Sequence, residues 1–358
     1  MTRKKFIILN IVSLFAVFFA AVGIFSLPKN LSSDFDAEIV YPNLINSLDQ
    51  LSSVVLIDKD STFTLYLKDN KWVIKERNDF PVDNKKLGEL LIKLSRTQKV
   101  EPKTSIVDRY ARLDLDSLEN NKESRVKKII LNDRNGDALV NLAVGKRKFT
   151  LGSDEGGTYV LFPDDSQSWL VTGEINPGVR VRDWVDRSLI NIPKERIKKI
   201  TITHPDGEKI FLEKNNLSDE YLTIRNIPKD KEPIRDSITD EIGRTLFNLM
   251  FDDVTQSDLI NFPRDKTVMA KFETFDGVEI IINFIEENDK NWLKISGSYK
   301  NNENANVLTN EEVTPENWSK VIDTLNESSR NWVYQFPGYE VSGIKKRMKD
   351  LVTDLENQ

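Results

Sequence analysis

Two hydrophobic patterns alternate along this chain. In residues 63–67, Phe63, Leu65 and Leu67 alternate with Thr64 and Tyr66, which is the two-residue period of a half-buried strand. Residues 83–96 instead space their leucines as one stripe of a helix, with Asp83 as N-cap after a proline. The stripe consists of Leu87, Leu90, Leu91 and Leu94.

The same reading places strands and turns along most of the chain. Asn135-Gly136 and Asp276-Gly277 are strong hairpin signals, because both residue pairs favour tight turns between strands. A second helix is expected from Ser237, with Ile238, Ile242, Leu246 and Leu249 as its stripe. The expected strands are 54–57, 63–67, 72–74, 126–131, 138–144, 158–162, 169–171, 197–203, 209–213, 221–225, 268–272, 278–284 and 292–295.

The order of these elements repeats. Corresponding landmarks lie roughly 140 to 155 residues apart, which is the kind of fixed period that an internal repeat produces. We therefore predict an α+β fold with two tandem antiparallel-sheet units, 51–172 and 197–300, each carrying a helix on one face and joined by a connector at 173–196. Chance agreement is the alternative, because strands and hairpins are common in all proteins.

The last part of the chain, residues 301–358, is predicted to be a helical segment. A helix is expected to begin at Thr314-Pro315, with Trp318, Ile322 and Leu325 as its stripe. Residues 331–336 look extended. A terminal amphipathic helix is expected to carry Ile344, Met348, Leu351, Val352 and Leu355.

Residues 6–27 are almost wholly apolar and uncharged, and roughly 20 such residues cross a bilayer as one helix. Arg3, Lys4 and Lys5 precede them, so residues 1–5 are expected in the cytoplasm and the chain from about residue 28 outside it. Residues 28–50 are interpreted as a tether. The alternatives are a signal peptide cleaved just before Ile24, or a buried helix of a soluble protein.

Composition narrows the function classes. Of the 358 residues, 30% are charged and 39% hydrophobic, as in ordinary globular domains. A formal net charge of −6 disfavours binding to nucleic acid. The chain has no cysteine, which excludes disulfides, thiolate metal sites and thiol nucleophiles.

Few residues suggest chemistry, and we assign no catalytic, cofactor-binding or metal-ligating residue. The single histidine, His204, is expected to be a solvated turn residue, and no serine-hydrolase or zinc-protease motif is present. Residues 133–137, Asp-Arg-Asn-Gly-Asp, resemble a calcium loop but fit a hairpin turn better. The six tryptophans are spread one per element, which is typical of core anchoring.

Two basic clusters have alternative interpretations. One consists of Lys146, Arg147 and Lys148, and the other of Arg180, Arg182 and Arg187. Either could meet lipid head groups or an acidic partner, whereas solvated strand and connector faces are the default explanation.

Several short motifs are similar to those of a known bacterial family. The chain resembles the domain-of-unknown-function 4340 family over most of residues 53–300. The motifs are Asn70-Lys-Trp-Val, the hairpin before residues 83–96, Tyr110-Ala-Arg-Leu-Asp-Leu115, Gly157-Thr-Tyr-Val160, Asp183-Trp-Val-Asp-Arg-Ser-Leu189 and Trp332-Val-Tyr334. The resemblance implies a membrane-tethered protein associated with ABC-transporter-type systems. It supplies no activity and no catalytic residues.

These observations lead to two hypotheses of different classes. The first is a non-catalytic binding or assembly component of an envelope or ABC-transporter-type complex, anchored in the cytoplasmic membrane by residues 6–27 and binding a membrane or envelope protein. The second is an envelope enzyme acting on glycan, with paired carboxylates between the two repeats; the 57 acidic residues leave room for this. The sequence does not identify a small-molecule ligand.

Overall fold

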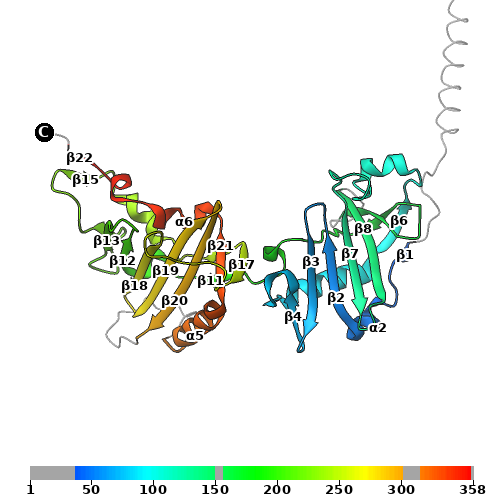
Figure 1. The fold of residues 1–358 in the computed structure, drawn as a ribbon, viewed down its shortest axis with the longest axis horizontal. Helices are drawn as coiled ribbons and strands as arrows, with labels where there is room; N and C mark the ends of the chain where they lie inside the picture. The colour runs from blue at the N-terminus through cyan, green and yellow to red at the C-terminus, as the bar shows by residue number, and fades with distance from the viewer. Residues whose placement is uncertain (1–36, 150–155, 301–314, 356–358) are drawn as a thin grey trace, which may run out of the picture. The chain divides into compact units, whose positions relative to one another are not determined.

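The computed structural model describes residues 37–149, 156–300 and 315–355 (Figure 1). The chain divides into two compact units, each built from separate stretches of sequence. Among the described residues, the first unit comprises 37–50, 91–129, 139–149 and 156–176, and the second comprises 51–90, 130–138, 177–300 and 315–355.

The first unit is organised around antiparallel strands. Their order is β1 (Glu38–Ile39), β6 (Gln98–Pro102), β10 (Trp169–Thr172), β9 (Gly157–Leu161) and β8 (Ala138–Lys148). Leu170 lies opposite Tyr159, and Ala143 lies opposite Leu161. Short helices accompany these strands: α2 (Leu44–Ser47), η1 (Leu48–Gln50) and η3 (Val107–Leu113).

Alternation along β8 explains which of its faces is buried. Val140, Leu142 and Val144 are almost fully buried, whereas the residues between them are only partly covered. Successive side chains of a strand point to opposite faces, so β8 buries one face in the core and offers its other face, with Asn141 and Ala143, to a partly covered layer. This second face becomes part of the site described below.

The second unit contains two groups of antiparallel strands. One has the order β2 (Leu51–Ile57), β3 (Thr62–Lys68), β4 (Lys71–Ile74) and β5 (Phe80–Pro81). The other has the order β14 (Thr223–Ile224), β13 (Lys209–Glu213), β12 (Ile197–Thr203), β18 (Val268–Thr274), β19 (Val278–Glu287), β20 (Lys290–Tyr299), β21 (Trp332–Phe336) and β17 (Asp253–Gln256). Two small pairs complete the unit, β11 (Ser188–Ile190) with β16 (Leu249–Met250), and β15 (Lys231–Pro233) with β22 (Val352–Asp354).

Helix α5 (Pro315–Asn331) packs on β20 in the second unit, as Figure 1 shows. Its contact is close at Gly297, where an added Cβ would lie 2.9 Å from Ile280 Cδ1 and from Ile322 Cδ1. The Asn326 amide accepts a hydrogen bond from the Gly297 N–H at 2.9 Å and donates one to the Gly297 carbonyl at 2.8 Å. Glycine at this position therefore allows the helix to approach the strand.

Several individual helices and strands were predicted correctly. The helix predicted at 83–96 is present as α3 (Asn84–Arg96), with Leu87, Leu90 and Leu94 buried. The helix expected from residue 314 is α5, and the extended stretch 331–336 is β21. Strand β7 (Lys127–Asp133) ends where the predicted Asn135-Gly136 turn begins.

The predicted fold class is nevertheless wrong. The described residues are mainly antiparallel sheet with few helices, rather than two tandem α+β units with a helical end. The proposed domain boundaries, 51–172, 173–196, 197–300 and 301–358, stay predictions. Residues 37–50, expected to belong to a tether, form β1, α2 and η1.

The long helix expected to begin at Ser237 does not form. In its place are η6 (Asp236–Thr239) and the four-residue helix α4 (Asp240–Gly243). Ile242, Leu246 and Leu249 are buried as expected, but Leu249 belongs to strand β16. Glycine, threonine, phenylalanine and asparagine follow Ile242 and are weak helix formers, and Asn248 adopts a φ of 52° that ends any helix.

The prediction of a terminal amphipathic helix is also wrong. Helix α6 (Gly338–Lys345) ends early, and η7 (Met348–Asp350) and strand β22 follow it. Arg347 pairs with Asp206 at 2.7 Å and with Glu208 at 2.5 Å, and these ion pairs hold the chain against the turn between β12 and β13. This anchoring redirects the chain into a strand that pairs with β15.

The apolar segment 6–27 lies outside the described residues. Among the residues that the structure describes, we find no helix with the length and apolar character that crossing a membrane requires.

Candidate ligand pocket

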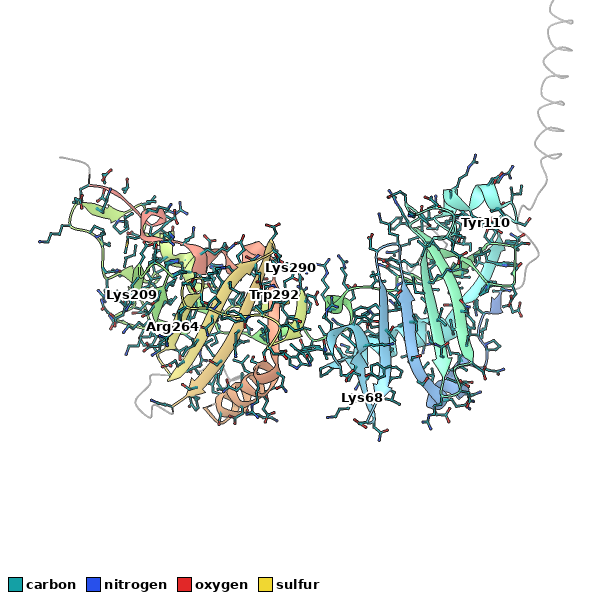
Figure 2. All side chains as sticks on the ribbon, viewed as in Figure 1. Lys68, Tyr110, Lys209, Arg264, Lys290 and Trp292 are labelled. Carbon is teal, nitrogen blue, oxygen red and sulfur yellow. The ribbon has the colours of Figure 1, made fainter. Side chains whose placement is uncertain are left out.

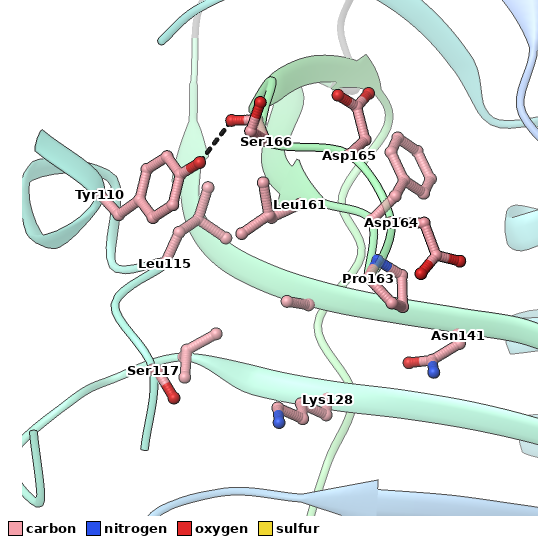
Figure 3. A pocket seen from close by; sticks show the side chains of 13 residues that line it. Tyr110, Leu115, Ser117, Lys128, Asn141, Leu161, Pro163, Asp164, Asp165 and Ser166 are labelled. Carbon is pink, nitrogen blue, oxygen red and sulfur yellow. Dashed lines mark hydrogen bonds between the residues drawn. The ribbon is translucent and has the colours of Figure 1, made fainter. Parts of the chain in front are cut away.

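A pocket of about 540 Å³ opens in the first unit (Figure 3). This volume lies in the usual range for sites that bind small ligands or peptide side chains. Its lining combines an apolar floor with a polar rim. The lining residues are Tyr110, Leu115, Ser117, Val126, Lys128, Asn141, Ala143, Leu161, Phe162, Pro163, Asp164, Asp165 and Ser166.

The floor is a hydrophobic cluster formed by η3, the segment after it, and strands β8 and β9. Tyr110, Leu115 and Val126 are its buried members, and Ala143 and Leu161 pack against them while remaining partly accessible. Figure 2 labels Tyr110 at its place on η3. Apolar surface that stays open inside a pocket favours an apolar ligand group.

Gly145 on β8 allows the segment after η3 to lie on the strand. An added Cβ at this residue would lie 2.1 Å from the Leu113 carbonyl oxygen and 2.9 Å from Leu115 Cγ. Both distances are too short for a side chain, so only glycine fits. The close approach places Leu115 over β8 and so closes one wall of the pocket.

A hydrogen bond joins two of the lining residues, Tyr110 and Ser166. The Tyr110 hydroxyl donates to the backbone carbonyl of Ser166, which lies in the loop between β9 and β10 (Figure 3). Burial, and secondarily the nearby Asp165 carboxylate, raise the pKa of the Tyr110 phenol. The phenol therefore stays protonated at neutral pH and remains a donor.

The loop between β9 and β10, residues 162–168, is held rigid by Asp165. Its carboxylate accepts hydrogen bonds from Trp169 Nε1 at 2.9 Å and from the Gln167 backbone N–H at 2.8 Å. These bonds, the Trp169 indole first, lower the pKa of the Asp165 carboxyl. The carboxylate therefore stays ionised and braces the loop.

Ser168 anchors the end of the same loop to residues after β6. Its backbone N–H donates to the Thr104 carbonyl at 2.8 Å, and its hydroxyl donates to the same carbonyl at 2.7 Å. The Lys103 N–H donates to the Ser168 carbonyl at 2.8 Å. A loop held at both ends loses little freedom when a ligand binds.

Phe162 at the start of the loop is held by aromatic and cationic neighbours. The Lys99 ammonium lies 5.1 Å from the centre of its ring and 4.7 Å from that of Trp169. Tyr41 packs edge-on against Phe162 at 6.4 Å and donates from its hydroxyl to the Asn141 carbonyl at 3.3 Å. Burial raises the pKa of the Tyr41 phenol, so this hydroxyl also stays a donor.

The polar rim carries both signs of charge. Lys128, half-buried on β7, and the exposed carboxylate of Asp164 line the same pocket, together with the Asn141 amide and the Ser117 hydroxyl. Ser117 accepts from the Glu119 N–H at 3.2 Å and keeps its own proton to donate. Within the part of the chain that the structure describes, the Lys128 ammonium has no ion-pair or hydrogen-bond partner.

A smaller pocket of about 370 Å³ lies in the second unit. Its lining is mainly apolar, from Phe80, Leu189, Phe251 and residues of α5. The Lys320 side chain also lines it. No rigid polar rim comparable to the 162–168 loop accompanies it in the described residues, so we treat the first pocket as the candidate site.

His204 does not occupy a solvated turn. The prediction for this residue is wrong, because its side chain is only 4% exposed and its Nε2 donates to the Lys346 carbonyl at 2.9 Å. The Nε2 bond ties the turn between β12 and β13 to the end of α6. His204 therefore has a structural explanation.

Both basic clusters carry ion pairs in the structure. Arg147 pairs with Glu174 at 2.6 Å. Arg187 pairs with Asp252 at 2.6 Å and also donates from Nε to the Phe251 carbonyl at 2.7 Å. Arg182 approaches the same Asp252 carboxylate at 3.5 Å, so the second cluster is tied to the two residues between β16 and β17 rather than freely presented.

Residues 133–137 form a turn, as the sequence predicted. Asp133 accepts hydrogen bonds from the backbone N–H groups of Asn135 at 2.8 Å and Asp137 at 2.9 Å, and Gly136 adopts a φ of 91°. Among the described residues, no group of three or more acidic or histidine side chains is placed to hold a metal ion.

The prediction that the six tryptophans anchor the core is confirmed for three of them. Trp184, Trp292 and Trp318 are buried, and Trp72, Trp169 and Trp332 are half-buried. Trp169 also has a second role, since its indole braces Asp165.

Sequence reasoning assigned no residue to this pocket. Tyr110 and Leu115 belong to one of the motifs that carry the family resemblance, and both are buried. Asp164, Asp165 and Lys128 were missed. The available signal was a turn-rich run, Pro163 to Ser168, placed between two strands and followed by Trp169.

The fold and the pocket together define a class, a protein of mainly antiparallel sheet with an apolar-floored pocket in its first unit. A family model, "Domain of unknown function (DUF4340)", matches residues 72–267, more than half of the chain. The chain belongs to this family, as the sequence resemblance predicted. Neither a search of curated proteins nor one of solved structures found a match.

Proposed function

We propose that this chain is a binding component of an envelope or transporter-type complex, and that its first-unit pocket holds part of a partner protein. The supporting observation is the preorganised pocket. Its rim loop is fixed by the Tyr110 to Ser166 hydrogen bond, by Asp165 and by Ser168, all within the chain itself. Preorganisation of this kind favours binding, because less conformational freedom is lost on association.

The proposed place of action is outside the cytoplasm, at the cytoplasmic membrane. Support comes from the sequence alone, from the apolar run 6–27 and the basic residues Arg3, Lys4 and Lys5 before it. A reporter enzyme fused after residue 358 tests this placement. Activity of a reporter that works only outside the cytoplasm supports it, and activity of a reporter that works only in the cytosol contradicts it.

Crosslinking in native membranes, followed by affinity purification of the full chain, tests the binding role. The informative variant is Ala143→Phe, which would fill the pocket from its floor. Ala138→Phe, on the same strand but exposed, is the matched control. We expect a reproducible partner with the unmodified chain and with the control, and loss of that partner with Ala143→Phe.

Two outcomes contradict the proposal. If the chain is recovered without any reproducible partner, it is not a stable component of a complex. If a partner is recovered equally with Ala143→Phe, the pocket does not hold it. The glycan-hydrolase alternative stays a prediction.

A further inference from the structure

We infer that the pocket takes the carboxyl-terminal end of a partner polypeptide, with an apolar last residue and a basic residue before it. This inference rests on the proposed function and specifies its ligand. It follows from three features of the pocket: its size, its apolar floor, and the opposite charges on its rim.

The size favours a chain end. A volume of about 540 Å³ holds a ligand of small-molecule dimensions. This corresponds to one or two residues, whereas a segment that passes through needs an extended groove. The partly accessible Ala143 and Leu161 side chains, packed against buried Leu115, offer the apolar surface on which the last side chain would lie.

The rim supplies groups for a terminal carboxylate. The Lys128 ammonium is a cation on a half-buried side chain without a partner in the described chain, and a carboxylate would satisfy it. The Asn141 amide and the Ser117 hydroxyl line the same pocket and can donate to a carboxylate oxygen. Capture of a terminal carboxylate is an established mode of peptide recognition.

The loop between β9 and β10 supplies a negative charge for the basic residue that precedes the last residue of the ligand. Asp164 is exposed on the rim, and its neighbour Asp165 is already engaged by Trp169 and Gln167. Asp165 therefore fixes the loop, and Asp164 remains to meet a positive charge. A lysine or arginine next to the last residue would provide this charge.

Isothermal titration calorimetry with the full chain in detergent tests the inference. The probes are the peptide acetyl-Gly-Ser-Gly-Lys-Leu as the free acid, the same peptide as its carboxyamide, and a free acid with glutamine in place of the lysine. For the unmodified chain, we expect the free acid to bind about tenfold more tightly than the amide, as expected for loss of a charge-assisted hydrogen bond. The glutamine peptide should bind about two- to fivefold more weakly.

Variants assign each preference to its residue. Lys128→Met should abolish the difference between acid and amide, and Lys128→Arg should retain most of it because the charge remains. Asp164→Asn should abolish the difference between the lysine and glutamine peptides. Thermal unfolding of each variant verifies that it is folded.

Equal binding of acid and amide by the unmodified chain would overturn the inference, as would an unchanged preference in Lys128→Met. Absence of peptide binding, together with partner loss in Ala143→Phe membranes, would reject the chain-end ligand and leave the binding role standing. Peptide binding without any recovered partner would instead reject the complex.

Discussion

The Tyr110 hydroxyl donates a hydrogen bond to the Ser166 backbone carbonyl, and this bond joins η3 to the loop between β9 and β10. The two residues lie 56 positions apart in the sequence. Both residues line the same pocket. The bond therefore holds the rim loop to η3 at the edge of the pocket.

Replacement of Tyr110 by phenylalanine should loosen the rim loop. Loss of one partly buried hydrogen bond is expected to lower the free energy of unfolding by about 0.5–1.5 kcal/mol. Urea denaturation measures this change. Tyr159→Phe is the control, because Tyr159 packs against the same cluster and no hydrogen bond of its hydroxyl is described; an equal loss in both variants would contradict the role of the Tyr110 bond.

The bracing of the loop by Asp165 should depend on pH. The pKa of the Asp165 carboxyl is lowered in the folded chain, chiefly by the Trp169 indole, so its ionised form favours folding. This contribution is present above the pKa of the unfolded chain, about 4, and is lost as the pH falls through the lower folded value. Unfolding free energies at pH 6 and below pH 4 measure it.

The matched variants for this pH effect are Asp165→Asn and Asp164→Asn. The first should be less stable than the unmodified chain at pH 6, and that difference should shrink as the pH falls. The second removes a neighbouring exposed carboxylate and should change stability little. A difference for Asp165→Asn that is constant with pH would contradict the account.

Gly145→Ala should disturb the wall of the pocket. The added Cβ would meet the Leu113 carbonyl oxygen at 2.1 Å, so the segment after η3 must shift. Overpacking of this kind costs about 1–3 kcal/mol of stability. Partner recovery should fall along with stability, because Leu115 moves with the segment.

Gly88→Ala, unlike Gly145→Ala, should increase the stability of the protein. Gly88 lies within α3, and an added Cβ there meets nothing within 4 Å. Alanine in place of a helical glycine stabilises by about 0.5–1 kcal/mol. If chemical denaturation shows the two substitutions to have equal effects, the close approach at Gly145 is not structurally important.

In the second unit, Asn326→Ala should weaken the attachment of α5 to β20. The substitution removes both hydrogen bonds to Gly297 and leaves its backbone groups without these partners. We expect a loss of about 1–3 kcal/mol. Asp323→Ala, at an exposed position of the same helix, should have little effect, and a similar loss there would contradict the assignment.

Local patterns predicted those elements whose stability is itself local. The leucine stripe of α3 and the alternation in β3 and β8 specify which face is buried, and the structure follows them. The turns at Gly136 and Gly277 follow from glycine's tolerance of positive φ, which is 91° at both residues. These features need no knowledge of distant contacts.

The errors occurred where distant contacts decide the conformation. Arg347 is redirected by Asp206 and Glu208, about 140 positions earlier, and a terminal helix therefore gives way to η7 and β22. Leu249 has helical spacing but pairs as a strand with β11. In both cases tertiary pairing outweighs a weak local preference.

The pocket was not predicted from the sequence for the same reason. In the sequence, Tyr110 and Leu115 are recognisable as apolar residues in a polar stretch. Lys128 and Asp164 look like ordinary surface charges, and only the fold brings them to one cavity. No periodicity or spacing in the sequence indicates that Lys128 and Asp164 line the same pocket.

The most direct test of the binding role is photo-crosslinking from the pocket itself. A photo-reactive amino acid at Ser117, on the rim, would be activated in intact cells, with the chain otherwise unmodified or carrying Ala143→Phe or Ala138→Phe. We predict one discrete crosslinked species that Ala143→Phe abolishes and Ala138→Phe retains. A crosslink that persists equally in all three chains, or no crosslink in any of them, would contradict the account.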